Sequence, residues 1–209
     1  MSKAQKRCLF FLSIVTLIIM VAIFAPVIST HNPNQAVLEN AFQSPSKEHI
    51  LGTDKMGRDV FSRIIYGART SISSTLLLVS AVLVVGGTLG IIAGYFGGII
   101  DNVIMRIADM MVSFPGMALA IALAGILGAG ITNAILAIMA VSWTKYARLA
   151  RSLVLKIRSY DYISVAILYG TKRRYILLRY ILPEVFPMLT ITAFTDIGGM
   201  MLELAGFSL

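Results

Sequence analysis

Residues 70–100, TSISSTLLLVSAVLVVGGTLGIIAGYFGGII, form a run of 31 positions without a charged side chain. A transmembrane α-helix needs only about 20 apolar residues to cross a hydrocarbon core about 30 Å thick. Small residues let helix backbones approach closely in lipid, where packing drives association, and this run carries Gly86, Gly87, Gly90, Gly94, Gly97 and Gly98. It therefore predicts a membrane span inside a packed helix bundle.

The composition of the whole chain agrees with that prediction. Of its 209 residues, 57% are hydrophobic and 13% are charged, whereas soluble domains are about half apolar and about a quarter charged. A soluble enzyme is therefore excluded. The single cysteine, Cys8, offers neither a disulfide framework nor a Cys/His zinc pattern.

Further apolar runs bring the expected number of spans to five. Residues 8–29 form the first, which we interpret as a retained helix because it exceeds the h-region of about 7–15 residues in a signal peptide. Residues 110–144 are also uncharged, but one helix of that length would measure about 52 Å. We expect a turn at Gly128-Ala129-Gly130, with helices over 103–127 and 131–148. The last run follows Pro183 and continues to Leu209.

Basic residues orient these spans. Residues 1–7 carry three Lys or Arg, and residues 145–183 carry nine against one acid: Lys145, Arg148, Arg151, Lys156, Arg158, Lys172, Arg173, Arg174 and Arg179. The positive-inside rule places both segments in the cytoplasm and residues 31–69 outside. This topology accounts for the net charge of +8, so we expect no nucleic-acid partner.

The cytoplasmic segment contains a second short helix. Residues 162–169, YISVAILY, are apolar almost all round, and such a helix must be buried against something. Ser159 or Asp161 is expected to cap its start, and Gly170 stands where a left-handed C-terminal cap would be. The residues alone leave two alternatives about equally open: packing on its own bundle or the lipid surface, and docking on a partner.

Residues 161–170, DYISVAILYG, followed by Tyr180 and Pro183, resemble the cytoplasmic loop of the membrane subunits of binding-protein-dependent ATP-binding-cassette (ABC) importers. In that family the loop reads Glu-Ala-Ala, three residues, Gly, and its short helix docks into a cleft of the ATPase subunit. Ser164 and Val165 stand where the family usually has Glu and Ala. The resemblance implies these ATPase-docking residues: Asp161, Ser164, Ala166, Gly170 and Pro183.

Residues 49–71, HILGTDKMGRDVFSRIIYGARTS, are similar to the external signature of the dipeptide, oligopeptide and nickel branch of these importers. Further matches are AGYFGG at 93–98, Asp109, SFP at 113–115 and SWTKYAR at 142–148. We expect a structured loop that ends in a short helix, with Arg58 and Arg63 as anchors through charge-assisted hydrogen bonds. The signature residues are Gly52, Asp54, Gly57, Arg58, Asp59, Arg63 and Arg69.

The resemblance, which runs from about residue 31 to the end, implies an all-α integral membrane protein, a polytopic bundle of the type I ABC importer kind. Residues 1–30 would form the cytoplasmic tail and first span, 31–69 the external loop, and 70–209 the transport core with its coupling loop at 149–183. Family members continue through one more loop and helix, so we expect five spans here with the final helix missing, as in a fragment or a truncated protein.

The implied function is that of a permease subunit in a bacterial cell membrane, with a cytoplasmic N-terminus and a pathway for peptides, nickel or metal chelates. The implied partners are a second permease subunit, two ATPase subunits, an extracellular substrate-binding protein and the bilayer. The chain would be no enzyme and would take no cofactor, and it has no phosphate-binding GxxxxGK[ST] loop. The alternatives are a secondary transporter or channel driven by an ion gradient, and a non-functional truncated permease.

Asp196 and Glu203 are two acids that lie within the last span. They are seven residues apart and so share one helix face, which makes both candidates for lining the pathway. We favour the plainer interpretation that they pair with polar groups of a missing helix or of a partner subunit, or that Glu203 already lies near the membrane interface. His31 and His49 have no acidic companions in a metal-binding pattern, so we expect solvated loop histidines and no metal site.

Overall fold

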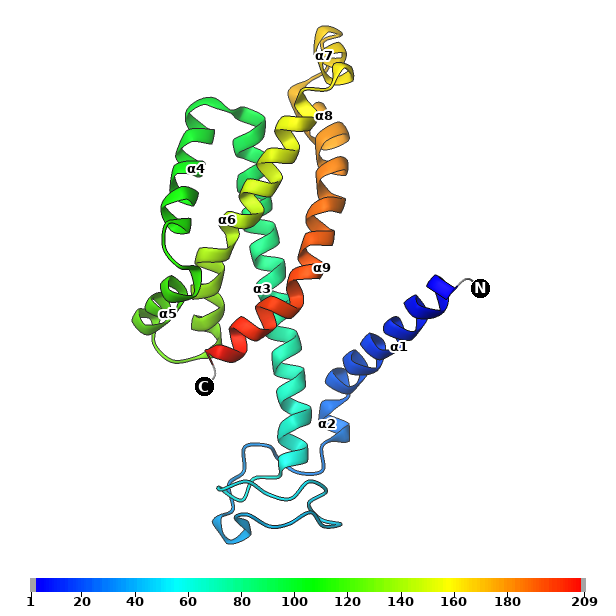
Figure 1. The fold of residues 1–209 in the computed structure, drawn as a ribbon, viewed down its shortest axis with the longest axis vertical. Helices are drawn as coiled ribbons and strands as arrows, with labels where there is room; N and C mark the ends of the chain where they lie inside the picture. The colour runs from blue at the N-terminus through cyan, green and yellow to red at the C-terminus, as the bar shows by residue number, and fades with distance from the viewer. Residues whose placement is uncertain (1–2, 208–209) are drawn as a thin grey trace. The chain divides into compact units, whose positions relative to one another are not determined.

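A computed structural model describes residues 3–207 and shows a helical protein (Figure 1). Over those residues no β-strand forms, and the one extended pairing is an isolated bridge between Thr53 and Asp59. The chain divides into two compact units at Ser73–Ser74. The all-α prediction is confirmed.

The first unit contains α1 (Lys3–Ile23), α2 (Ala25–Ile28), a short 3₁₀-helix (Leu38–Asn40) and the beginning of α3 (Val60–Phe96). Asp59 starts α3 by accepting the backbone N–H of Ser62 at 2.8 Å, as an N-cap carboxylate does. The short helix expected at the end of the external signature is therefore the first part of α3, which begins ten residues before the predicted span at 70 and continues unbroken.

In its described part the second unit holds the rest of α3 and six further α-helices along the chain. These are α4 (Gly98–Val112), α5 (Gly116–Leu127), α6 (Ile131–Arg158), α7 (Asp161–Leu168), α8 (Arg173–Ile176) and, after the π-helical segment Leu177–Ile181, α9 (Leu182–Gly206). Helix α6 is central, because it packs against α4, α5 and α9.

Glycines on α3 bring it against α6. A β-carbon at Gly86 or Gly90 would overlap backbone carbonyl oxygens of α6, and one at Gly94 would lie 2.9 Å from Cβ of Val154. The predicted close approach of helix backbones is confirmed, because these positions have no room for even a methyl group.

Membrane spans are where the sequence prediction needs correction. Among the described residues, three helical stretches are long and apolar enough to cross a membrane, namely Gln5–Ile23, Val60–Phe96 and Arg173–Gly206. Helices α4 and α5 make a fourth if they count as one broken span, since they bend by 92° at their junction. The single helix predicted over 103–127 is therefore wrong, and Pro115, which lacks a backbone N–H, lies at the break.

The predicted fourth span at 131–148 is helical, but it is not apolar enough over the length of a membrane crossing to count among these candidate spans. Helix α6 continues to Arg158 and carries polar and basic side chains that lower its mean hydropathy. The turn before it is as predicted: Gly128 and Gly130 have φ of 88° and 137°, and Asn133 donates to the carbonyl of Leu127 at 2.8 Å.

The coupling loop expected at 149–183 is mostly helical. Helix α6 occupies its first part, and a continuous helical stretch resumes at Arg173, ten residues before Pro183. Pro183 does not begin that stretch but lies in the first turn of α9, after the π-helical segment. The π-helical segment just before Pro183 already interrupts the regular hydrogen-bond ladder, and such an interruption accommodates a residue without an N–H.

Candidate functional site

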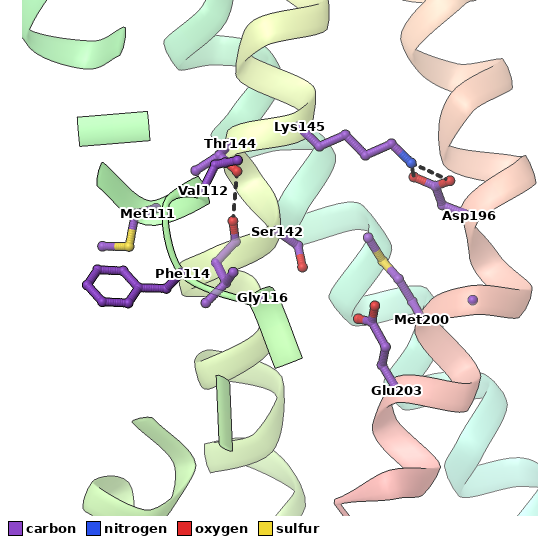
Figure 2. Close-up of a pocket in the computed structure, with 12 residues that line it drawn as sticks. Met111, Val112, Phe114, Gly116, Ser142, Thr144, Lys145, Asp196, Met200 and Glu203 are labelled. Carbon is purple, nitrogen blue, oxygen red and sulfur yellow. Dashed lines mark hydrogen bonds and ion pairs between the residues drawn. The ribbon is translucent and has the colours of Figure 1, made fainter. Parts of the chain in front are cut away.

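A cavity of about 470 Å³ lies where the break between α4 and α5 faces α6 and α9. Phe114 and Gly116 come from the break, Ser142 and Lys145 from α6, and Met200 from α9 (Figure 2). Irregular backbone at membrane depth is tolerated where it lines a cavity. The bend of α4 and α5 is therefore part of what forms this space.

Asp196 closes one side of the cavity through an ion pair. Both of its carboxylate oxygens accept from Nζ of Lys145, at 2.8 and 2.6 Å, and Oδ2 also accepts from the hydroxyl of the buried Tyr146 at 3.1 Å. Figure 2 shows Lys145 reaching from α6 across to α9. The expectation that Asp196 pairs with a missing helix or another subunit is wrong, because its partners lie on α6 of the same chain.

Glu203 lies about two turns further along the same face of α9. It lines the same cavity as Asp196 (Figure 2). It is half-buried, and within the described part of the chain no hydrogen bond or ion pair engages its carboxylate. The spacing of seven residues does bring both acids to one cavity, as the helical repeat predicts. Their role in a pathway stays a prediction.

Three basic residues on α6 form ion pairs between helices at a spacing of three. Lys145 pairs with Asp196 on α9, Arg148 with Asp109 at 2.7 Å, and Arg151 with Asp101 at 2.6 Å, both acids being on α4. In the sequence these three residues belong to the basic segment 145–183, whose charges predict the orientation of the protein in the membrane. Their i, i+3, i+6 pattern was the missed signal, since that spacing keeps side chains near one helix face.

Helix α7 of the coupling loop ends in a Schellman motif. Gly170 has a φ of 75°, its N–H donates to Ile167 O at 2.9 Å, and the N–H of Thr171 donates to Ala166 O at 3.0 Å. This pair of bonds satisfies carbonyls that would otherwise lack partners at the helix end. The left-handed conformation predicted for Gly170 is confirmed.

The cap predicted at the start of α7 is wrong. Tyr160 occupies the N-cap position and makes no side-chain capping bond. Ser159 instead closes the end of α6, where it donates both its hydroxyl and its backbone N–H to the carbonyl of Lys156. Asp161 lies in the first turn, where a carboxylate interacts favourably with the helix dipole.

One side of α7 belongs to the bundle and the rest of it is open. Ile163 is buried in the same hydrophobic cluster as Ile157 and Ile176, whereas Val165 and Leu168 are 47% and 84% exposed. Figure 1 shows α7 beyond the end of α6, next to α8. The sequence predicted a helix that needs burial on all sides, and its own chain covers only one.

A polar contact fixes this helix to the start of α9. The hydroxyl of Tyr162 donates to Oε1 of Glu184 at 2.7 Å. Burial first, and then this bond to a carboxylate, raises the pKa of Tyr162 to about 12. Among the other implied docking residues, Ser164 and Pro183 are exposed and Ala166 is half-buried.

The external signature is organised around Asp54. Its carboxylate accepts the N–H groups of Met56 at 2.8 Å and Arg58 at 3.1 Å, and it pairs with the guanidinium groups of Arg58 and Arg63. Burial would raise the pKa of Asp54, but these hydrogen bonds and the Arg58 charge outweigh it and lower the pKa to about 2. Arg69 lies further along α3 on an exposed position and is not brought into this network.

The signature glycines allow tight loop packing. Gly52 and Gly57 have φ near 70°, and a β-carbon at either would overlap a backbone carbonyl oxygen of the same segment. Each is therefore required both by backbone conformation and by space.

The histidines differ from the prediction. His49 is buried, its Nδ1 lies 3.0 Å from Oδ1 of the buried Asp59, and its ring stacks on that of His31 with centroids 4.7 Å apart. They are therefore not lone solvated side chains. Asp59 follows His31 by 28 positions and His49 by 10 in the sequence, and only the folded loop brings the three together.

Comparison with known proteins now places the chain. Residues 86–209 match the family model of the binding-protein-dependent transport system inner membrane component. The chain belongs to this family. Residues 3–45 of the chain also match the N-terminal transmembrane domain of oligopeptide transport permease C. The two matches together include α1 and the helices that line the cavity.

Three relatives with high sequence identity are permeases of the same family. The chain is 40% identical over 203 residues to the dipeptide transport system permease protein DppC of Alkalihalophilus pseudofirmus, covering 97% of this chain and 67% of the relative. It is 40% identical to the probable D,D-dipeptide transport system permease protein DdpC of Escherichia coli (92% and 64% covered) and 36% identical to the nickel transport system permease protein NikC of that organism (94% and 71%). The chain thus spans about two thirds of the length of these relatives.

Proposed function

We propose that this chain is a permease subunit of an ATP-driven importer and that α7 is the element through which it couples to an ATPase subunit. The observation that carries the proposal is the exposed apolar surface of α7, formed by Val165, Ile167, Leu168 and Tyr169. Burying apolar surface is the main favourable term in association. Because Ile163 is the residue of α7 that is buried in the bundle, that surface is available for a partner's cleft.

The segment formed by α7 and α8 also has contacts that can transmit a movement from a partner to the bundle. Tyr162 connects it to Glu184 at the start of α9, and the hydroxyl of Tyr95 at the end of α3 donates to the carbonyl of Arg173 at 2.8 Å. A displacement of α7 would therefore act on α9, which carries Asp196 and Glu203 at the cavity. This is the connection that alternating access requires.

The cavity supports a pathway at the junction of α6, α9 and the broken pair. A permease moves its cargo without changing it, so the polar groups at the cavity would guide or exclude charge rather than perform chemistry. For the cargo we propose peptides or nickel and metal chelates, in line with the relatives. The partners would be a second permease subunit, two ATPase subunits and an extracellular substrate-binding protein, with the complex in the bacterial cell membrane and the N-terminus in the cytoplasm.

Co-purification with the ATPase subunits in detergent tests the coupling. Leu168→Asp places a charge on the most exposed aliphatic position of α7 and is expected to abolish ATPase binding, because the charge would be desolvated in the cleft. Leu168→Met, a volume-conserving change at the same position, is expected to retain binding. Because the side chain is 84% exposed, neither change disturbs the subunit's own core.

If Leu168→Asp and Leu168→Met bind the ATPase subunits equally well, the proposal that α7 forms the interface is refuted. Uptake by the reconstituted complex separates the proposal from a secondary transporter. We expect uptake to require ATP and to persist when ion gradients are collapsed, and uptake driven by a gradient without ATP would refute the importer function.

A further inference from the structure

The external segment gathers two imidazoles and a carboxylate. His31, Glu48 and His49 each present a ligand atom, and these atoms all lie within 4.8 Å of one another. They border a cavity of about 130 Å³. His49 is buried, His31 is half-buried and Glu48 is exposed, so the group is rooted in the loop at one side and open at the other.

The buried carboxylate of Asp59 fixes one of the imidazoles. Its Oδ1 lies 3.0 Å from Nδ1 of His49, and its Oδ2 accepts the N–H of Ser62 at 2.8 Å. An ionised carboxylate is acceptor-only, so Nδ1 of His49 is the nitrogen that donates to it, and Nε2 is left as the ring nitrogen that can face a metal ion. Histidines that bind metals are commonly oriented in this way by a carboxylate behind them.

The separations are close to those of a bound ion. Ligand atoms about 2.0–2.2 Å from a tetrahedral zinc ion lie about 3.3–3.6 Å from one another. Atoms within 4.8 Å need to approach by about an ångström more, which the exposed side chain of Glu48 can supply by a change of rotamer.

We propose that His31, Glu48 and His49 form a binding site for a divalent transition-metal ion of the zinc class, with Asp59 orienting His49. Two imidazoles and one carboxylate suit zinc and its neighbours, whereas magnesium and calcium require oxygen ligands. The ion would join the beginning of the external segment, at His31, to its middle, at Glu48 and His49.

Metal binding by the full chain tests this site. The protein is purified in detergent with a tag that contains no histidine, in a Cys8→Ser background, and is titrated with Zn²⁺ by calorimetry and analysed for bound zinc. We expect one zinc ion per chain, no displacement by Mg²⁺ or Ca²⁺, and at least about a tenfold loss of affinity in His31→Gln and in Glu48→Gln. Glu39→Gln, an exposed acid of the same segment outside the cluster, is the control and should bind as the parent does.

Asp59→Asn provides a test of the orienting role. Loss of a carboxylate behind a metal-bound histidine costs about 10–100-fold in metal affinity, although no ligand is removed. Substitution of the buried His49 or Asp59 can unfold the loop, so the decision rests on His31→Gln and Glu48→Gln, whose side chains are accessible. Absence of stoichiometric zinc, or equal binding by these two variants and the parent, would overturn the proposal. X-ray absorption showing sulfur, or no imidazole, around the zinc would do so as well.

Discussion

Gly90→Ala tests whether the contact between α3 and α6 holds the bundle together. An ideal β-carbon at position 90 would lie 2.7 Å from Cβ of Ala150 and would overlap the carbonyl oxygen of Ala147. Carbon atoms in contact prefer about 3.5–4.0 Å, so the helices must part by about 1 Å. Helix separation at this point would also loosen the contacts of Gly86 and Gly94.

The expected magnitude follows from two opposing effects. Overpacking costs typically about 1–3 kcal/mol, and the rigid backbone on the far side places this change near the upper end. Alanine gains about 1 kcal/mol over glycine in helix propensity, so the net loss is about 2 kcal/mol. Gly67→Ala, on the same helix with nothing within 4 Å of the added carbon, should show only the gain.

The assay is unfolding in mixed micelles with increasing denaturing detergent. Trp143 is the only tryptophan and its carbonyl oxygen borders Gly86, so its fluorescence reports this contact. We expect the free energies of unfolding of the two variants to differ by about 3 kcal/mol, with Gly90→Ala the less stable. If Gly90→Ala is as stable as Gly67→Ala, the close approach of α3 and α6 does not exist.

Three other expectations follow from the loops. The pKa of Asp54 is lowered from 3.8 to about 2, so the stability that its carboxylate gives the external loop is complete above about pH 4 and is lost as the pH falls towards 2. Hydrogen exchange of the loop in the parent protein should therefore speed up between about pH 4 and pH 2. The loop of Asp54→Asn should exchange faster already at pH 6, and its stability should not change between about pH 4 and pH 2. Gly170→Val and Ala166→Asp should each abolish ATPase co-purification at normal membrane levels of the subunit, and full binding by both would reject the docking function. Cysteine in place of Lys47 should react with an impermeant reagent on intact cells and cysteine in place of Lys172 should not; the reverse pattern would invert the topology.

The conformation of the coupling loop shows how far local sequence reasoning extends. Gly170 was predictable because a helix end with a left-handed residue is a local problem with a preferred solution. The cap was not, because Ser159 had two acceptable roles, and the end of α6 lies closer to it than the start of α7. The exposure of α7 depends on which neighbours are present, and a pattern of apolar residues does not contain that information.

The charged side chains show the same limit. Positive residues at 145–183 were interpreted as loop charges, but Lys145, Arg148 and Arg151 lie along α6 and pair with acids on two other helices. Asp101 and Asp109 are 50 and 39 positions away from their partners. No local pattern connects residues so far apart, whereas the helix spacing of the three basic residues was visible in the sequence.

Local features of the sequence were enough to indicate an all-helical membrane protein, a turn at Gly128–Gly130 and glycines that bring α3 close to a neighbour, because hydrophobic run length and backbone freedom act locally. The 92° break in the third span, the ion pair of Asp196 with Lys145 and the cluster of His31, Glu48 and His49 became visible only in the folded chain. These depend on which distant segments pack together, since an ion pair or a ligand cluster forms only when folding brings groups within a few ångströms.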